Sequence, residues 1–321
     1  MLFEDIKGQD SVLDILKKSI EKGRIFSSYL FVGPDGVGKS LTAGVFAKAI
    51  NCLERNGVDP CGNCSPCKKI DLKIHPDVLF IEPKANSSSI AIDEIRKMLI
   101  QTNFKPYEAK MKVFIIENTH SMNAEAANAF LKTLEEPPES TVFILIARSK
   151  EMLLPTIVSR CHVVEFLSAP RDLVHEVIRN KFSITDDEAL VLSNFASGSI
   201  GKAVRMKNQN AIVRKNRIID SFFSGGIDFQ DELSLYSGKM ELKENLEFLL
   251  SLLRDMFLCN LKEPKDAFFN IDKIEKIKQY AGRFSSERLD FIIKKVIMLL
   301  SYVDYNVNPK MIIDSLTLEV V

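Results

Sequence analysis

Gly33-Pro34-Asp35-Gly36-Val37-Gly38-Lys39-Ser40 matches the phosphate-binding loop pattern Gly-x-x-x-x-Gly-Lys-[Ser/Thr] at every fixed position. Glycines let the backbone curl so that successive N–H groups face phosphate oxygens, and a following helix adds its positive N-terminal end. In such loops the lysine, here Lys39, reaches the β- and γ-phosphates, and the hydroxyl of Ser40 ligates Mg²⁺. We therefore expect residues 33–40 to bind ATP or ADP with Mg²⁺.

The residues on either side of this loop favour a nucleotide site over a simple glycine-rich turn. Residues 29–32 predict a short buried strand, and residues 41–50 carry apolar side chains at helical spacing. A strand, the loop and a helix in this order are the context that the pattern requires.

Apolar strands and helices alternate through the first half of the chain. We expect further strands at 78–81, 112–116, 141–146 and 162–166, and further helices at 9–22, 90–100 and 124–134. Fully apolar strands between helices indicate an α/β domain whose parallel sheet is covered on both faces.

The sequence becomes helical after Pro170. Helices are expected at 171–182 and 186–197, another opens at 198–201, and helical spacing continues from residue 209, with a strand considered only for the last few residues. We therefore expect an α/β nucleotide-binding domain at 1–167, a small helical domain at 168–208 and an all-α domain at 209–321.

Composition narrows the possible functions. The 321 residues include 43 Lys plus Arg and 43 Asp plus Glu, so the chain lacks the basic excess of a self-sufficient DNA-binding protein. No apolar run is long enough to cross a membrane, and the acidic N-terminus lacks the apolar region of a signal peptide. The expectation is a cytoplasmic protein that touches nucleic acid only locally or as part of an assembly.

The strand at 112–116 is followed by Glu117-Asn118, where a P-loop enzyme commonly carries Asp-Glu. Glu117 can still ligate Mg²⁺. An amide such as that of Asn118 cannot accept a proton near neutral pH, so it cannot serve as a base. We therefore expect bound nucleotide to be hydrolysed weakly or not at all.

Four cysteines, Cys52, Cys61, Cys64 and Cys67, lie within sixteen residues. Their spacing favours a tetrahedral Cys₄ zinc site at 52–67, which is structural because the protein supplies every ligand. An iron–sulfur site or an empty cluster remains an alternative, although in iron–sulfur motifs the isolated fourth ligand follows the closely spaced run.

Arg160, in Ser159-Arg160-Cys161, admits two interpretations. It could act as an arginine finger that delivers positive charge to the nucleotide of a neighbouring subunit. The sequence by itself favours the simpler alternative, a surface arginine in a salt bridge.

Taken together, these residues resemble bacterial DNA polymerase III clamp-loader subunits, the AAA+ proteins that load a ring-shaped sliding clamp onto primed DNA. The resemblance rests on five segments that occur in the family's order: residues 33–40, the four cysteines, His75-Pro76-Asp77, Asn-Ala-Phe-Leu-Lys-Thr-Leu-Glu-Glu-Pro-Pro at 128–138, and Ser159-Arg160-Cys161. It covers the first two domains well, and the C-terminal helices fit the collar through which these subunits assemble.

Within the family the chain resembles delta-prime subunits more than the tau/gamma motor. Asn118 stands where the motor has its catalytic glutamate, and Gly198-Ser199-Ile200-Gly201-Lys202 lacks an arginine where the motor has its sensor. The chain also ends after the collar, without the motor's long extension.

The resemblance implies an AAA+ P-loop domain, a helical lid domain and an all-α collar. It also implies that Arg160 reaches the ATP of the adjacent motor subunit, and it therefore shifts the preference to the finger interpretation. The expected partners are tau/gamma- and delta-type subunits, with the sliding clamp and primed DNA contacted through the complex.

Two other functions compete with this expectation. In the first, the chain is a catalytically active tau/gamma-like ATPase in which Glu117 supports hydrolysis without a second carboxylate. In the second, it is a small-molecule kinase, which is disfavoured because the cysteine segment and the long helical C-terminal part would have no purpose there.

Overall fold

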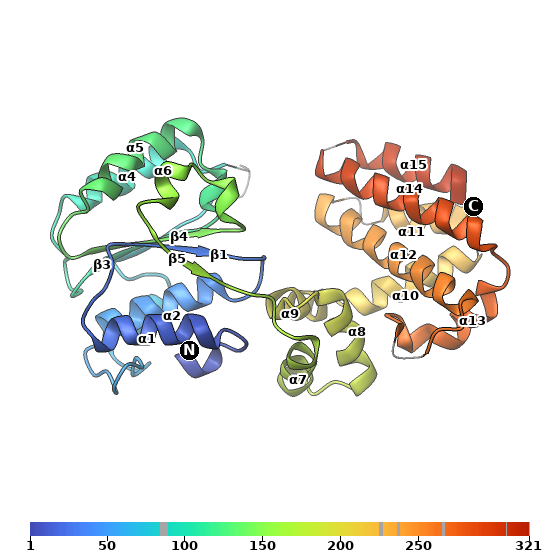
Figure 1. Ribbon diagram of the computed structural model, residues 1–321, viewed down its shortest axis with the longest axis horizontal. Helices are drawn as coiled ribbons and strands as arrows, with labels where there is room; N and C mark the ends of the chain where they lie inside the picture. The colour runs from blue at the N-terminus through green and yellow to red at the C-terminus, as the bar shows by residue number, and fades with distance from the viewer. Residues whose placement is uncertain (84–88, 225–226, 236–237, 265–266, 306, 321) are drawn as a thin grey trace. The chain divides into compact units, whose positions relative to one another are not determined.

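Figure 1 shows the computed structural model, which describes residues 1–321 except 84–88, 225–226, 236–237, 265–266, 306 and 321. The described chain forms two compact units. Unit 1 comprises Met1–Leu173 and Gly198–Lys202, and unit 2 comprises Val174–Ser197 and Ala203–Val321. The division into three domains made from the sequence stays a prediction.

Unit 1 is built on a five-stranded sheet in which every pair of neighbouring strands is parallel. The strands lie in the order β2-β3-β4-β1-β5, with bounds β1 Ser28–Val32, β2 Val78–Ile81, β3 Lys112–Ile116, β4 Thr141–Ala147 and β5 His162–Glu165. β1, β3 and β4 are buried along their whole length, as expected for strands covered on both faces. The predicted parallel α/β sheet is confirmed.

Helices cover both faces of this sheet (Figure 1). Their bounds are α1 Asp10–Glu21, α2 Lys39–Asn51, α3 Ser65–Asp71, α4 Ile92–Thr102, α5 Ala124–Glu135 and α6 Pro155–Val158, with 3-10 turns η1 Phe3–Asp5, η2 Thr119–Ser121 and η3 Lys150–Met152. On one face Phe31 packs in a buried cluster with Leu16 of α1 and Phe46 of α2. On the other face Phe114 packs in a second cluster that includes Phe130 of α5. Successive residues of each strand thus serve opposite layers.

The regular secondary structure of unit 2 is helical, with no strand among its described residues. Its helices are α7 Arg171–Phe182, α8 Asp186–Ala196, α9 Ile200–Asn208, α10 Ala211–Ser224, α11 Ile227–Ser234, α12 Lys239–Asn260, η5 Ile271–Lys273, α13 Ile274–Ala281, α14 Ser286–Asp304 and α15 Pro309–Val320. Of these, α7 and α9 begin with residues of unit 1. The long helix α12 packs against α10, α13 and α14, and α15 packs against α11 and α14. The predicted helical C-terminal half is confirmed.

The last residues of the chain correct one expectation. A strand considered there is wrong for the described residues, because they belong to α15. Ile312, Ile313 and Leu316 are all buried, and this spacing puts three apolar side chains on one helix face.

Within the described residues, no helix combines the length and apolar character needed to cross a membrane.

Candidate nucleotide and metal sites

The glycine-rich loop lies where the sequence predicts, between the end of β1 and the start of α2. Ligands of parallel α/β sheets bind outside the carboxyl ends of the strands, so this is the edge at which a nucleotide is expected. Gly36 has φ +73°, and a Cβ there would lie 2.4 Å from Ser199 Oγ. Glycine is therefore required at Gly36 by both backbone conformation and space.

Lys39 is the first residue of α2, and its side chain is buried within the loop. Its ammonium donates hydrogen bonds to the carbonyl oxygens of Gly33 and Pro34. Burial lowers the pKa of Lys39, while the Asp35 and Glu117 carboxylates act in the opposite direction. The structure thus holds a cation inside the predicted phosphate site, and its contact with phosphate stays a prediction.

The two residues predicted to ligate Mg²⁺ are brought together from positions 77 apart in the chain. The Ser40 hydroxyl donates a hydrogen bond of 2.7 Å to Glu117 Oε2. Burial raises the pKa of Glu117, and the hydrogen bond from Ser40 opposes this shift. A hydroxyl and a carboxylate are oxygen donors of the kind that Mg²⁺ prefers, so the donor set fits this ion.

Asn118 follows Glu117 in the left-handed backbone region, with φ 49° and ψ 45°. Asparagine tolerates this conformation better than most residues. The next residue, Thr119, holds the turn in place, because its hydroxyl donates to Ile116 O and accepts from Ile146 N. An amide therefore occupies a well-fixed position directly after the candidate metal ligand.

Sequence reasoning missed Arg148, which follows β4. Its guanidinium Nη2 lies 2.8 Å from Asp35 Oδ2, and its carbonyl oxygen accepts a hydrogen bond from Gly33 N. The phosphate-loop pattern specifies no residue at this place. A topological argument could have found it, because Arg148 follows a predicted parallel strand and the carboxyl ends of neighbouring parallel strands meet at one edge of the sheet.

The segment Gly198–Lys202 also contacts the loop within unit 1. Ser199 Oγ donates a 2.8 Å hydrogen bond to Asp35 O, and Gly201 N donates another of 2.8 Å to Gly36 O. A Cβ on Gly201 would lie 2.7 Å from Gly36 O, so only glycine permits this approach. The sequence predicts that a helix opens in this segment and that it lacks the motor's arginine, but not that it contacts the loop.

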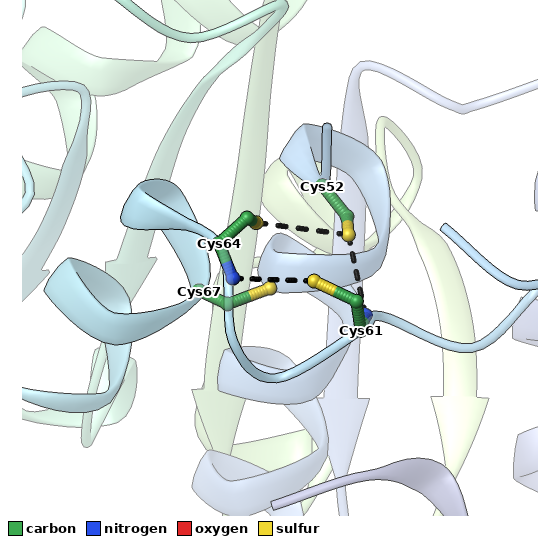
Figure 2. Close-up of side chains that lie close together, drawn as sticks. All are labelled: Cys52, Cys61, Cys64 and Cys67. Atoms are coloured by element: carbon green, nitrogen blue, oxygen red, sulfur yellow. Dashed lines mark hydrogen bonds between the residues drawn. The ribbon is translucent and has the colours of Figure 1, made fainter. Parts of the chain in front are cut away.

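The four cysteines converge as predicted (Figure 2). Their sulfur atoms all lie within 4.8 Å of one another, and the Cys52 and Cys64 sulfurs are 3.8 Å apart. Four thiolates at about 2.3 Å from one tetrahedral zinc ion would be about 3.8 Å apart. The arrangement fits such an ion.

Local structure positions each of these cysteines. Cys52 directly follows α2, while Cys64 is the N-cap of α3 and Cys67 lies in its first turn. Backbone N–H groups point at the sulfurs, with Cys61 N donating to Cys52 Sγ and Cys64 N to Cys61 Sγ. For Cys64, burial raises the pKa, but hydrogen bonds from Leu53, Cys67 and Cys61 outweigh it and lower that pKa to about 6. Burial has the opposite result at Cys52 and Cys67, where it raises the pKa. Among these thiols, Cys64 thus favours the thiolate form that metals require.

Arg160 lies in the turn between α6 and β5. Its Nη2 is 2.6 Å from Glu135 Oε1, and its Nη1 donates to Thr156 O at 2.9 Å. About a third of the side chain is exposed. The surface salt bridge considered from the sequence is present, and a role in a neighbouring subunit stays a prediction.

Comparison with known proteins finds relatives among subunits of DNA polymerase III. The chain is 28% identical to subunit delta' of Bacillus subtilis over 322 residues, which cover 97% of this chain and 95% of that protein. It is 33% identical over 236 residues to subunit tau of Bacillus subtilis, with 74% of this chain and 40% of that protein covered. It is 29% identical over 235 residues to subunit tau/gamma of Haemophilus influenzae, with 72% and 34% covered. The chain therefore spans between a third and two fifths of the length of these tau and tau/gamma relatives.

Two family models also match, in consecutive parts of the chain. Residues 212–320 match the model described as "DNA polymerase III, delta subunit, C terminal". Residues 8–170 match the model described as "DNA polymerase III, delta subunit". Since this second match covers just over half of the sequence, the chain belongs to the DNA polymerase III delta subunit family.

Proposed function

We propose that the chain is a clamp-loader subunit of a bacterial DNA polymerase III holoenzyme, of the delta-prime type. In this role it binds ATP or ADP with Mg²⁺ and works in a complex with tau/gamma- and delta-type subunits. The complex contacts the sliding clamp and primed DNA. The similarity to a delta' subunit along nearly the whole chain supports this type.

One observation carries the nucleotide proposal: Ser40 Oγ and Glu117 Oε2 lie 2.7 Å apart beside an intact phosphate-binding loop. With Mg²⁺ bound, these two oxygens would hold the ion, and the ion would neutralise phosphate charge. Asn118 next to Glu117 cannot accept a proton from water. The chain therefore binds nucleotide and turns it over slowly or not at all.

The cysteine cluster serves as a structural zinc site in this proposal. All four coordination positions are filled by Cys52, Cys61, Cys64 and Cys67, so zinc would stabilise the fold and leave no position for a substrate.

Arg160 acts in trans in this proposal. Glu135 and the carbonyl of Thr156 hold its guanidinium at a partly exposed position. A planar guanidinium group that already binds a carboxylate can exchange the carboxylate for phosphate oxygens of a neighbour's nucleotide. We therefore assign Arg160 as the arginine finger of this subunit.

The test is Arg160→Ala in the complex reconstituted with its own partner subunits. ATPase activity of the complex should fall by a large factor, since arginine fingers contribute roughly 10³–10⁵ in rate. Nucleotide binding by the isolated variant should not change. Arg160→Lys should restore little of the ATPase activity, because the point charge of lysine cannot replace the planar guanidinium group. Arg24→Ala, at an exposed arginine after α1, is the control. Full ATPase activity and clamp loading with Arg160→Ala would contradict the assignment of Arg160 as an arginine finger.

One observation favours the alternative of an active tau/gamma-like ATPase. Glu117 is a carboxylate whose pKa is raised by burial, a property of general bases. Its contact with Ser40, however, favours a place at the metal ion. Single-turnover hydrolysis by the isolated chain separates the two, with Lys39→Ala as the variant that should not bind nucleotide. Hydrolysis at the rate of active P-loop ATPases would support the alternative.

A further inference from the structure

Asp35 is an unfavourable residue to find inside a loop that binds phosphate. It lies between Pro34 and Gly36, and its carboxylate would repel the phosphates of a nucleotide. The structure gives this carboxylate one ion-pair partner among the described residues, Arg148, at 2.8 Å.

Arg148 is held next to the loop by its backbone as well. Its carbonyl oxygen accepts a 3.1 Å hydrogen bond from Gly33 N, at the first residue of the loop. The side chain therefore starts from a fixed point and reaches Asp35 across the edge shared by β1 and β4.

The charges around the loop show what Arg148 contributes. Lys39 and Arg148 are cations whose fields act on this site, and Asp35 and Glu117 are its carboxylates. Lys73 and Glu82 also act on Glu117, but they pair with each other at 2.6 Å and their charges cancel. His120 adds no charge near neutral pH, because burial lowers its pKa and the field of Arg148 lowers it further. With Arg148 the four charges sum to zero, and without it they sum to −1. The loop would then oppose an anionic ligand.

We propose that Arg148 is a positioning residue for the nucleotide, which acts by neutralising Asp35 inside the phosphate-binding loop. This inference rests on the proposed nucleotide binding and names the intrachain partner that this loop needs. It applies to nucleoside di- and triphosphates alike, because the repulsion that Arg148 removes acts on any phosphate in the loop.

The pair contributes little to folding, so its variants can be studied. Both side chains are more than half exposed, and exposed ion pairs add little to stability. Arg148→Ala and Asp35→Asn should therefore fold and unfold at nearly the temperature of the wild type.

The experiment is a double-mutant cycle in which binding of MgADP to the full chain is measured by calorimetry. Arg148→Ala should weaken binding about tenfold, the size expected for one uncompensated charge near the ligand in a solvated site. Asp35→Asn should bind at least as tightly as the wild type. Arg148→Ala combined with Asp35→Asn should return to the affinity of Asp35→Asn by itself, because no carboxylate remains to be neutralised.

Lys150→Ala is the matched control. It also removes an exposed cation after β4, but Lys150 pairs with Glu165, 3.4 Å away. Its affinity for MgADP should equal that of the wild type.

Each other outcome overturns a defined claim. If Lys39→Ala abolishes binding while Arg148→Ala leaves it unchanged, the nucleotide site stands and the role of Arg148 is wrong. If Arg148→Ala weakens binding equally with and without Asp35→Asn, the arginine acts on the nucleotide directly, and neutralisation of Asp35 is wrong. If the wild-type chain binds no nucleotide, the proposed function and this inference both fail.

Discussion

Asp77 is almost completely buried, and its carboxylate accepts backbone hydrogen bonds from Tyr107, Glu108 and Ala109 at 2.8–3.0 Å. Burial raises the pKa of Asp77, but these hydrogen bonds outweigh it, and the pKa lies below its ordinary value. Asp77, the residue directly before β2, thus holds in place the segment that leads into β3. Its ionised form stabilises unit 1.

We predict that Asp77→Asn destabilises the protein by about 1–3 kcal/mol at pH 7, because an amide replaces one of two acceptor oxygens with a donor. The folded-state pKa is lowered, so the contribution of Asp77 is complete above its unfolded value of 3.8 and is lost as pH falls through the folded value. Urea unfolding of both proteins should show a difference in midpoint that shrinks below pH 4. Asp14→Asn, at an exposed position in α1, should show none. A difference that is independent of pH would contradict this role.

At the residue scale, the sequence could predict those site residues that belong to a sequence motif or follow a predicted strand. Lys39, Ser40 and the cysteines belong to motifs, and Glu117 follows a recognisable strand. Arg148 could not be predicted, because its contact with Asp35 depends on which strands lie side by side. Strand order is set by packing across the whole sheet and leaves no local mark in the sequence.

Among the elements, α2 connects the two candidate sites. Its first residues, Lys39 and Ser40, belong to the phosphate-binding loop, and its C-cap is Cys52. A second tie joins α2 to α3, where the buried Lys48 ammonium lies 2.7 Å from Asp71 Oδ1. The cysteine site therefore anchors the far end of the helix that carries the nucleotide residues.

We predict one zinc ion per chain, lost in Cys64→Ser, with faster hydrogen exchange in α3. Nucleotide affinity should change little, because Lys48 and Asp71 still hold α2 and α3 together. Elemental analysis of protein prepared without added metal gives the metal content, and Cys259→Ser, in α12, is the control. Finding iron, or no metal in the wild-type protein, would contradict the zinc assignment.

A second prediction at this scale concerns the start of α9. In Gly201→Ala the new methyl group would press on Gly36 O and Gly36 Cα, at 2.7 and 2.9 Å, so the loop must shift. Overpacking of this kind costs about 1–3 kcal/mol. If half of that cost falls on the bound state, affinity for MgADP should fall by about two- to tenfold.

Gly44→Ala is the matched control for this change. Gly44 lies inside α2 with nothing within 4 Å of an added Cβ, so alanine should stabilise the helix and leave binding intact. Unchanged MgADP affinity in Gly201→Ala would mean that the contact between Gly198–Lys202 and the loop has no part in nucleotide binding.

For the whole molecule, periodicity separates the α/β part from the helical part but cannot assign every segment to a unit. Residues 198–202 belong to unit 1, although the residues on both sides of them belong to unit 2. The reason is the pair of hydrogen bonds that Ser199 and Gly201 donate to carbonyl oxygens of the loop. No repeat or residue spacing in the sequence predicts these two bonds.

Helix α14 offers the clearest surface for assembly in unit 2. Its buried face carries Leu289, Ile292, Val296, Leu299 and Val303, yet Phe291, Met298 and Tyr302 are exposed at helical spacing on another face. An exposed apolar stripe of this kind is typical of a protein interface. If the C-terminal helices form the proposed collar, this stripe should contact a neighbouring subunit.

We predict that Met298→Asp prevents the chain from joining the reconstituted clamp loader, because a carboxylate would be buried without a partner at the interface. Binding of MgADP by the isolated variant should remain normal, since Met298 belongs to unit 2 and the nucleotide residues belong to unit 1. Met240→Asp, at an exposed methionine in the first turn of α12, controls for the added charge and should assemble normally. Gel filtration of the mixed subunits measures assembly, and thermal unfolding shows whether the variant is folded. A folded Met298→Asp chain that assembles as well as the wild type would exclude this face of α14 from the collar, whereas loss of assembly in both variants would mean that added charge in unit 2 is enough to block it.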